Sequence, residues 1–509
     1  MDDNRTSAPE GASFYWYDYE TFGLDRRFDR PAQFAGIRTD LDFNPIGEPD
    51  LFYDKPSFDT LPNPQSCLIT GITPQLCAEK GLAESEFAAE VWSRFNKPGT
   101  MSIGYNSLGF DNEVSRFLFW RNFLEPYTHQ WKDGCSVWDL YPFTAAVWAL
   151  RGEGIRWPTW EEVAKIAPQY ADHKPGVCFK LEFLSRFNNI EHAHAHDALS
   201  DVEATIGMAR LLRDRAPKLW DWALGHRSKK AVTNALDAGP VIWISPRFPQ
   251  ERGRIVLGRR IGTNPENGSE AWIWNLAYDP AELSGISAED FRRRAFGRRE
   301  ELAEGEKPLP VYKLKTNASP FVCSSLRVLP ADKAAAYGLD IAAALENSRK
   351  LEAMAHRLQE LSAEIAALPE EGERPVHDVD AGLYDGGFPS EADRAMMARV
   401  CRCSPEQLAE RAASGGLVFE DPRFNELLFR FRARSWPETL SDGELARWRS
   451  FCASRLIEGA EPKVLTVSDY FEMIDAIRQN TDDGDEKTQE LLEMLYSWGE
   501  SAGEFCSAD

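Results

Sequence analysis

The pattern of apolar and polar positions divides the chain into a mixed first part, a strand-rich second part and a helical third part. The first part opens on Phe14–Gly23, a run of aromatic side chains dense enough for a buried strand. Gln33–Asp40 and Leu51–Tyr53 predict two more strands, separated by the turn-forming residues Asn44–Pro49. Short connections of this kind favour an antiparallel meander. The spacing of apolar residues then predicts a helix over Glu84–Phe95.

Strands and helices alternate over the rest of the first part. Ile69–Pro74 has the pattern of an apolar loop, with Thr73 and Pro74 placed to open a helix. Met101–Asn106 predicts a short strand, and a helix is expected to begin at Asp111. Further helices are predicted over Trp138–Leu150, over Leu181–Phe187 and from Asp197 to about Arg213. Three antiparallel strands followed by such alternation are typical of a ribonuclease H-like α/β domain.

The second and third parts differ in character from the first. Short strands separated by Gly and Pro suggest a small β-barrel: Val241–Ile244, Arg254–Leu257, Ala271–Leu276 and Val311–Lys315. A long helical stretch follows over Ala331–Ala367, and Glu370–Pro375 is the best candidate for a linker. From Asp380 onward the pattern is helical. We therefore expect domains at residues 12–215, 216–368 and 376–509.

Two carboxylates stand one residue apart at the end of the first strand. Side chains of a strand alternate between its faces, so Asp18 and Glu20 point the same way. Neighbouring carboxylates near an apolar strand repel each other and lose solvation, and a divalent cation with a preference for oxygen relieves both effects. The alternative is a strand that ends in a polar turn supplied by Thr21 and Gly23.

Two later segments carry groups that belong to the same kind of site. Asp111 follows a strand end, which is where open α/β sheets build their sites. Asp197 is a plausible N-cap, which places His196 just before a helix and Asp201 one turn inside it. An alternative is a zinc site formed by the alternating His192, His194 and His196, although no cysteine lies close by in sequence. Otherwise His192 and His194 are polar loop residues.

The composition narrows the classes to which this protein can belong. A chain of 509 residues with 43% hydrophobic residues is expected to form two to four domains. No apolar run is long enough to span a bilayer and no signal peptide pattern is present, so a membrane partner is not expected. The nine scattered cysteines form no CxxC pair, which indicates reduced thiols and a cytoplasmic location.

The charge distribution bears on a nucleic-acid partner. A net charge of -23 argues against one, but salt screens charges beyond roughly 8–10 Å, so a local basic patch can still bind phosphates. Arginines gather in the second part, at positions 247, 252, 254, 259, 260, 292, 293, 294, 298 and 299. Tryptophans interleaved with them favour a surface that stacks bases. The alternative is that Trp272 and Trp274 lie in the core.

The order of these acidic groups resembles that of the DEDDh family of 3′→5′ exonucleases, with Asp-x-Glu on the first strand and His-x-x-x-x-Asp entering the last helix. Several segments are similar to bacterial exonuclease I: Asp18–Gly23, Asp29–Ala35, Leu68–Pro74, Gly104–Asn106, Ala193–Ala198, Asp393–Ala395 and Arg432–Arg434. The similarity runs nearly end to end. It implies an α/β ribonuclease H-like exonuclease domain, an SH3-like β-barrel and a C-terminal α-helical domain.

The resemblance also implies an activity and its residues. The expected reaction is two-metal-ion hydrolysis of single-stranded DNA to 5′-mononucleotides, in DNA repair and recombination, with Mg²⁺ or with Mn²⁺ as a substitute. Asp18, Glu20 and Asp201 would ligate one ion, Asp111 would help to hold the second, and His196 would be the general base. Substrate contacts are expected from Glu20 and from Gly71 and Ile72.

The resemblance further implies a second partner, the acidic C-terminal tail of single-stranded DNA-binding protein (SSB), with Arg151 and Arg227 as candidate contacts. Two features depart from the family pattern here: the chain is shorter before Val241, and Trp222 replaces an expected tyrosine. A monomer is expected. Two other functions remain open, an exoribonuclease that trims RNA 3′ ends and a non-catalytic scaffold that binds DNA ends.

Overall fold

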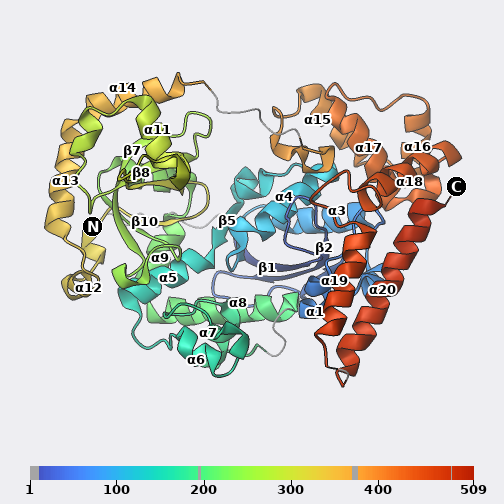
Figure 1. Ribbon diagram of the computed structural model, residues 1–509, viewed down its shortest axis with the longest axis horizontal. Coiled ribbons are helices and arrows are strands. Elements are labelled where there is room, and N and C mark those ends of the chain that lie inside the picture. The colour runs from blue at the N-terminus through green and yellow to red at the C-terminus, as the bar shows by residue number, and fades with distance from the viewer. Residues whose placement is uncertain (1–10, 193–196, 370–376, 483, 509) are drawn as a thin grey trace. The chain divides into compact units, whose positions relative to one another are not determined.

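The computed structural model describes residues 11–192, 197–369, 377–482 and 484–508 (Figure 1). Two compact units divide the chain. The first comprises Met1–Val137, His192–Glu203 and Arg374–Asp509, and the second comprises Trp138–Glu191 and Ala204–Glu373. The predicted linker Glu370–Pro375 and the histidines His194 and His196 lie outside the described residues. No helix among the described residues is long and apolar enough to cross a membrane.

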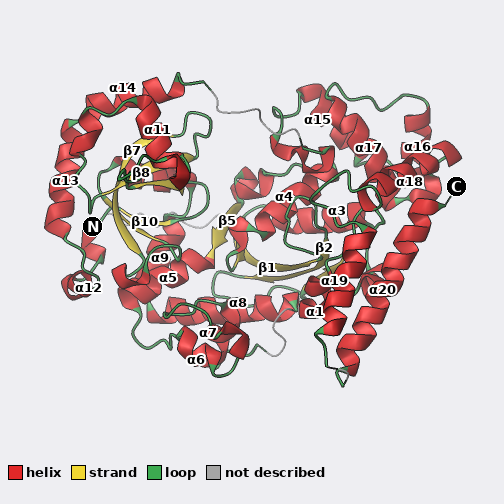
Figure 2. Ribbon diagram, viewed as in Figure 1, coloured by secondary structure: helices red, strands yellow, loops and turns green. Residues whose placement is uncertain are grey.

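A mixed five-stranded sheet carries the start of the chain (Figure 2). Its strands are β1 (Ser13–Thr21), β2 (Pro31–Thr39), β3 (Asp50–Tyr53), β4 (Thr100–Gly104) and β5 (Ser136–Asp139), in the order β3-β2-β1-β4-β5. The first three strands are antiparallel, as predicted, and β4 runs parallel to β1. The register of β1 against β2 shifts between Glu20 and Thr21, so β1 carries an irregularity where its two carboxylates stand.

The helices of this region are α1 (Pro64–Thr70), α2 (Pro74–Lys80), α3 (Glu84–Phe95), α4 (Asp111–Arg121) and α8 (Ala198–Arg215). The predictions for α3, for the start of α4 and for the start of α2 at Pro74 are confirmed. The prediction of a loop at Ile69 and Thr70 is wrong, because both residues end α1. Asn63 caps that helix through the backbone N–H of Gln65, and Gly71, at a φ of 72°, ends it.

The helices that follow β5 are α5 (Leu140–Arg151), α6 (Trp160–Ala164), α7 (Leu181–Phe187), α9 (Pro217–Gly225) and α10 (Lys229–Asp237). The helix predicted from Trp138 begins two residues later. Trp138 belongs to β5, and Asp139 caps α5 by accepting a hydrogen bond from the backbone N–H of Tyr141. The helix predicted over Leu181–Phe187 is confirmed.

Aromatic side chains of β1 form the core beneath the first sheet. Tyr15, Tyr17 and Tyr19 lie on one face and pack with Phe34 of β2 and with apolar residues of α3 and α4. On the other face, Phe14 and Trp16 pack against Phe43. This alternation places the carboxylates of Asp18 and Glu20 on the face opposite to the tyrosines.

The second unit contains an antiparallel five-stranded sheet, which confirms the strand-rich second part. Its strands are β6 (Val241–Ile244), β7 (Ile255–Thr263), β8 (Glu270–Asn275), β9 (Val311–Lys315) and β10 (Phe321–Cys323), in the order β10-β6-β7-β8-β9. The sequence pattern did not predict β10, because three residues are too few to show an alternation.

The prediction that tryptophans of the second unit offer a base-stacking surface is wrong for Trp272 and Trp274. Both side chains are buried, at 4% and 0% exposed, and so belong to the core. Several of the gathered arginines are engaged with acidic partners. Arg260 lies 2.6 Å from Asp237, and Arg294 lies 2.9 Å from Glu282. Local ion pairs therefore balance part of the positive charge that the sequence shows.

The remaining helices complete both units. Those of the second unit are α11 (Ala288–Phe296), α12 (Ala331–Ala336), α13 (Ile341–Ala353) and α14 (Ala355–Ala366). The single helical stretch predicted over Ala331–Ala367 is therefore broken, because Gly338 has a φ of 61° and Asp340 caps α13. Those of the first unit are α15 (Glu391–Val400), α16 (Pro405–Ala413), α17 (Pro422–Ser435), α18 (Asp442–Leu456), α19 (Val467–Gln479) and α20 (Glu486–Ser507).

Charged side chains join the two ends of the first unit in its interior. We call this group the buried ion cluster; its members are Arg30, Asp59, Glu84, Arg121, Asp378, Asp380, Arg430, Arg434 and Arg455. Arg30 and Arg434 each lie 2.9 Å from Oδ2 of Asp59. Arg430 and Arg455 each lie 3.0 Å from Oδ2 of Asp380. Ion pairs thus connect the β2 region to α17 and α18.

The arginines decide the ionisation of the two central carboxylates. Burial alone would raise the pKa of Asp59, but the charges of Arg434, Arg30 and Arg455 hold it below its ordinary value. Burial opposes ionisation of Asp380 in the same way, and the surrounding guanidinium groups hold its pKa well below the ordinary value. Both carboxylates are therefore charged and paired.

Candidate active site

The carboxylates predicted from the end of β1 meet a third from α8. Oxygen atoms of Asp18, Glu20 and Asp201 lie within 4.8 Å of one another. Asp18 and Glu20 come from one face of β1, and Asp201 comes from the first turn of α8. The side chain of Glu20 is 9% exposed, and those of Asp18 and Asp201 are half-buried, so the group is recessed but not fully enclosed.

The start of α8 is fixed by hydrogen bonds to its cap and to β2. Oδ2 of Asp197 accepts a hydrogen bond from the backbone N–H of Ser200 at 3.3 Å, which confirms Asp197 as the N-cap. Gln33 of β2 donates from Nε2 to Asp197 and accepts from the backbone N–H of Ala198 at 3.1 Å. These contacts hold the first turn of α8, and with it Asp201, against the sheet.

Asp111 approaches the group from α4. It is the first residue of that helix and is 7% exposed. Its carboxylate is close enough to raise the pKa of both Asp18 and Glu20 by its charge. Four of the five predicted catalytic residues therefore gather in one place. The fifth, His196, lies outside the described residues.

The electrostatics of the group favour a bound cation. Burial is the first reason why the pKa of Asp18 is raised well above its ordinary value, and the charges of Asp111, Asp201 and Glu20 add to it. Burial and the charges of Asp201 and Asp111 raise the pKa of Glu20 to about 8. A divalent cation removes this repulsion, and carboxylate oxygens are the donors that Mg²⁺ and Mn²⁺ prefer. The residues present therefore fit a metal site.

His192 is a contact that the sequence interpretation missed. Its Nε2 lies 2.6 Å from Oδ1 of Asp201, and its imidazole is only 3% exposed. It is a loop residue, as expected, but its side chain is buried and paired. Alternation of three histidines gave no reason to prefer the first one, because its partner is defined by the fold. This hydrogen bond orients the carboxylate of Asp201.

The loop between α1 and α2 presents Gly71 and buries Ile72. The side chain of Ile72 is 5% exposed and packs in an apolar cluster with Phe22 and Phe28. Gly71 is exposed, and a side chain added there would meet no atom within 4 Å. Thr73 then caps α2 by accepting from the backbone N–H of Leu76 at 3.1 Å. The exposed part of this loop is thus Gly71.

The two predicted partner residues lie in the second unit. Arg151 is the last residue of α5, and its Nη1 donates to the backbone carbonyl of Leu150 at 2.6 Å. Arg227 follows α9, and burial lowers its pKa to about 10. It lines a narrow hollow together with Trp138, Phe143, Trp222, His226 and Phe321. The ring of Trp222 stacks on that of His226 at 4.3 Å.

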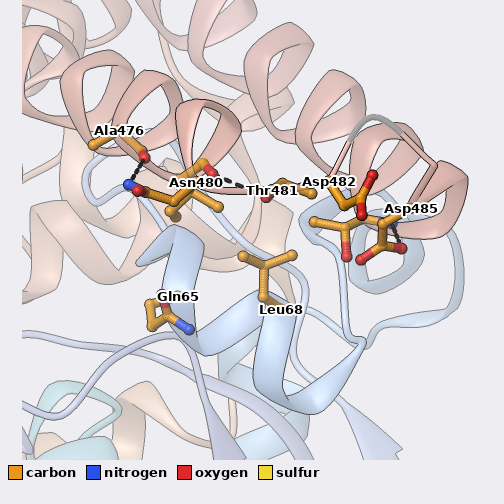
Figure 3. Close-up of a pocket in the computed structure, with 9 residues that line it drawn as sticks. Gln65, Leu68, Ala476, Asn480, Thr481, Asp482 and Asp485 are labelled. Atoms are coloured by element: carbon orange, nitrogen blue, oxygen red, sulfur yellow. Dashed lines mark hydrogen bonds between the residues drawn. The ribbon is translucent and has the colours of Figure 1, made fainter.

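A separate cavity of about 540 Å³ lies between α1, α19 and the start of α20 (Figure 3). Several of its polar side chains bond to nearby backbone groups. Asn480 donates to the carbonyl of Ala476 at 2.7 Å, and Asp485 accepts from the backbone N–H of Thr488 at 3.1 Å. The cavity contains none of the clustered carboxylates, so it is not the candidate active site.

Known families match the chain in the order of its parts. An exonuclease model matches residues 15–209, the exonuclease I SH3-like domain matches residues 227–366, and the exonuclease I C-terminal domain matches residues 377–502. Exodeoxyribonuclease I of Haemophilus influenzae is 38% identical over 492 residues, which covers 96% of this chain and 98% of the relative.

Solved structures agree with the family models. Exonuclease I from Methylocaldum szegediense aligns with a TM-score of 0.85 at 36% identity, over 96% of this chain and 99% of that one. E. coli exonuclease I in complex with a dA16 oligonucleotide aligns with a TM-score of 0.83 at 35% identity, over 96% of this chain and 100% of that one. A structure of SSB and exonuclease I with an inhibitor aligns with a TM-score of 0.82 at 34% identity, over 96% of this chain and 99% of that one.

The fold and the carboxylate group define a hydrolytic nuclease with a ribonuclease H-like exonuclease domain, an SH3-like domain and a C-terminal helical domain. This class fits the two sheets and the helices described above. The chain belongs to the exonuclease I family.

Proposed function

We propose that the protein removes nucleotides from the 3′ end of single-stranded DNA and releases 5′-mononucleotides, with two Mg²⁺ ions at its carboxylate group. The observation that carries this proposal is the approach of Asp18, Glu20 and Asp201 to within 4.8 Å of one another. Mn²⁺ shares the preference for oxygen donors and would substitute for Mg²⁺.

Each residue has a task in this proposal. Asp18, Glu20 and Asp201 hold one ion, and Asp111 with Asp18 helps to hold the other. When bound, the ions activate the attacking water and stabilise charge on the leaving oxygen. His192 orients Asp201 through its hydrogen bond of 2.6 Å. His196 accepts a proton from the attacking water, a role worth roughly 10²–10⁴ in rate.

The loop at Gly71 and Ile72 supports recognition of a free end. We place the terminal nucleotide against Gly71, with Glu20 beside it. The open space around Gly71 supports this placement, and Ile72 anchors the loop in the core below. Stacking and backbone contacts of this type tolerate any base, so we expect little dependence on sequence.

A gel time course on end-labelled single strands tests the activity. A 5′-labelled strand should shorten step by step, whereas a 3′-labelled strand should release labelled mononucleotide from the first time point. A chelator should stop both reactions, and Mg²⁺ should restore them. Faster decay of a matched RNA strand would identify an exoribonuclease instead. A protein that binds the DNA but cuts it with neither Mg²⁺ nor Mn²⁺ would be an end-binding scaffold.

We also propose that the C-terminal tail of SSB binds the second unit at Arg227, with Arg151 as a further contact. Arg227 lines the same hollow as Trp222 and Phe321, a combination that suits an acidic peptide with apolar side chains. Binding of a labelled tail peptide, measured by fluorescence anisotropy, should weaken roughly tenfold in Arg227→Ala. The exposed Lys230→Ala serves as the control. Equal affinities for both variants would place the tail elsewhere.

The remaining features of the proposal concern organisation. We propose a monomer that works in the cytoplasm in DNA repair and recombination. The nine cysteines are free thiols, which supports a reducing compartment. The ranges of the matching families support domain boundaries at residues 12–215, 216–368 and 376–509.

A further inference from the structure

Tyr19 lies between the two carboxylates of β1 but faces away from them. Side chains alternate along a strand, so Tyr19 points to the side of the sheet on which α3 and α4 pack. It is 5% exposed and contacts the ring of Phe34 at 4.9 Å. A tyrosine in such surroundings needs a partner for its hydroxyl group, because an unpaired buried hydroxyl is unfavourable.

That partner is Ser115, one turn into α4. The hydroxyl oxygens of Tyr19 and Ser115 lie 2.9 Å apart, and Ser115 is fully buried. Oγ of Ser115 also donates to the backbone carbonyl of Asp111 at 2.9 Å. Since a serine hydroxyl has one proton, which this second bond uses, Tyr19 donates to Ser115. The three residues form a chain of hydrogen bonds from β1 to the first residue of α4.

The start of α4 has no capping side chain. Its N-cap residue, Phe110, makes no side-chain capping hydrogen bond. Most other long helices of the first unit begin with such a bond, for example α17 at Asp421 and α18 at Ser441. The first turn of α4 is therefore positioned by contacts with the rest of the unit. The hydrogen bonds that start at Tyr19 are among these contacts, and unlike apolar contacts they depend on direction.

Among the apolar contacts around it, the pair of hydroxyl groups fixes the position of α4 relative to β1. Tyr17, Phe34, Phe87 and Phe119 belong to the same buried cluster, and hydrocarbon contacts of this kind tolerate small shifts between elements. A hydrogen bond between two buried hydroxyl groups does not, because a shift of α4 leaves the hydroxyl of Tyr19 without its partner. Phenylalanine would fill nearly the same space as Tyr19, so what the hydroxyl contributes is the alignment of α4 with β1.

We propose that Tyr19 and Ser115 are positioning residues that set the distance between Asp111 and the pair Asp18 and Glu20. The inference rests on the proposed function, in which these carboxylates hold the metal ions. Tyr19 lies on the strand that carries Asp18 and Glu20, and it bonds to the helix that carries Asp111. Loss of the hydroxyl frees α4 to shift, and Asp111 then binds its ion less tightly.

The test is direct binding of Mn²⁺ to the whole protein without DNA, followed by electron paramagnetic resonance. Tyr19→Phe should weaken the binding of one Mn²⁺ by roughly 10-fold, the lower end of the range for groups that orient metal ligands, because Tyr19 acts on Asp111 through the helix. The Mg²⁺ concentration for half-maximal activity should rise in parallel, while KM for single-stranded DNA stays constant. Unchanged Mn²⁺ binding in Tyr19→Phe would overturn the inference.

Tyr15→Phe is the matched control. Tyr15 lies on the same strand and face, is buried like Tyr19, and donates its hydroxyl to Asp50 at 2.9 Å instead of to α4. It should lose similar thermal stability and keep wild-type Mn²⁺ affinity. Equal losses of affinity in both variants would show a general loosening and contradict the role of Tyr19. A wild-type protein that binds no Mn²⁺ would instead refute the proposed function itself.

A second variant separates folding from positioning. Ser115→Ala leaves the hydroxyl of Tyr19 buried without its partner and should be less stable than Tyr19→Phe. The double variant removes both hydroxyl groups, so its thermal stability should recover while its Mn²⁺ affinity remains low. Recovery of the affinity together with the stability would show that the pair serves stability alone, and would overturn the proposal.

Discussion

Asp18→Asn should lower the rate of DNA hydrolysis at least about 10³-fold and should leave the affinity for single-stranded DNA nearly unchanged. Asp18 belongs to the group whose oxygen atoms lie within 4.8 Å, and in the proposed function it contacts both ions. An amide has no charge and is a weaker ligand. A loss of several kcal/mol of stabilisation in the transition state corresponds to this factor.

The same variant should be more stable than the wild type when metal is removed. The pKa of Asp18 is raised by burial and by three neighbouring carboxylates, so its charge opposes folding in the absence of a cation. Thermal unfolding in chelator, stopped-flow hydrolysis and DNA-binding titrations measure the three effects. Asp221→Asn, exposed on α9, is the control. Wild-type hydrolysis by Asp18→Asn would refute the assignment of Asp18.

Asp380→Asn should lower the free energy of unfolding by about 3–5 kcal/mol, the range found when one partner of a buried ion pair is removed. Asp380 is fully buried and accepts from Arg430, Arg434 and Arg455. The amide removes one of the negative charges that these guanidinium groups share, and Asp59 and Asp378 remain beside them. Denaturant unfolding followed by circular dichroism measures the loss. Asp279→Asn, which breaks an exposed ion pair with Lys350, should cause no measurable change.

Lowering the pH should remove the stabilisation that the charge of Asp380 contributes to the fold. The pKa values of Asp59 and Asp380 are below the ordinary 3.8, so both groups stabilise the fold above that pH and lose this effect as the pH falls further. The difference in stability between the wild type and Asp380→Asn should therefore shrink below pH 3.8. A difference that stays constant into strong acid would mean that the charge of Asp380 is not what stabilises the cluster.

The alternation of β1 was sufficient to predict that Asp18 and Glu20 share a face, and the capping pattern at Asp197 was sufficient to place Asp201 in the first turn of α8. Both predictions rely on geometry within a few residues. The antiparallel meander and the helix over Glu84–Phe95 were predictable for the same reason.

The contacts that sequence reasoning missed join distant residues. Arg30, Asp59 and Asp380 each have the pattern of a surface charge, and only the fold buries them together. His192 could not be distinguished from its neighbours before Asp201 was placed beside it. Trp272 and Trp274 misled in the opposite direction. The sequence around them is rich in arginine, but β8 is buried on both faces, so its tryptophans belong to the core.

The interior of the first unit has a consequence for how the protein is made. Phe22, Phe28 and Ile72 share one apolar cluster with Tyr470 of α19 and with Leu492 and Leu495 of α20. Translation delivers these groups at opposite ends of its course, so this apolar cluster stays incomplete until α20 has been synthesised. The C-terminal helices α19 and α20 must therefore leave the ribosome before the interior of the first unit is filled.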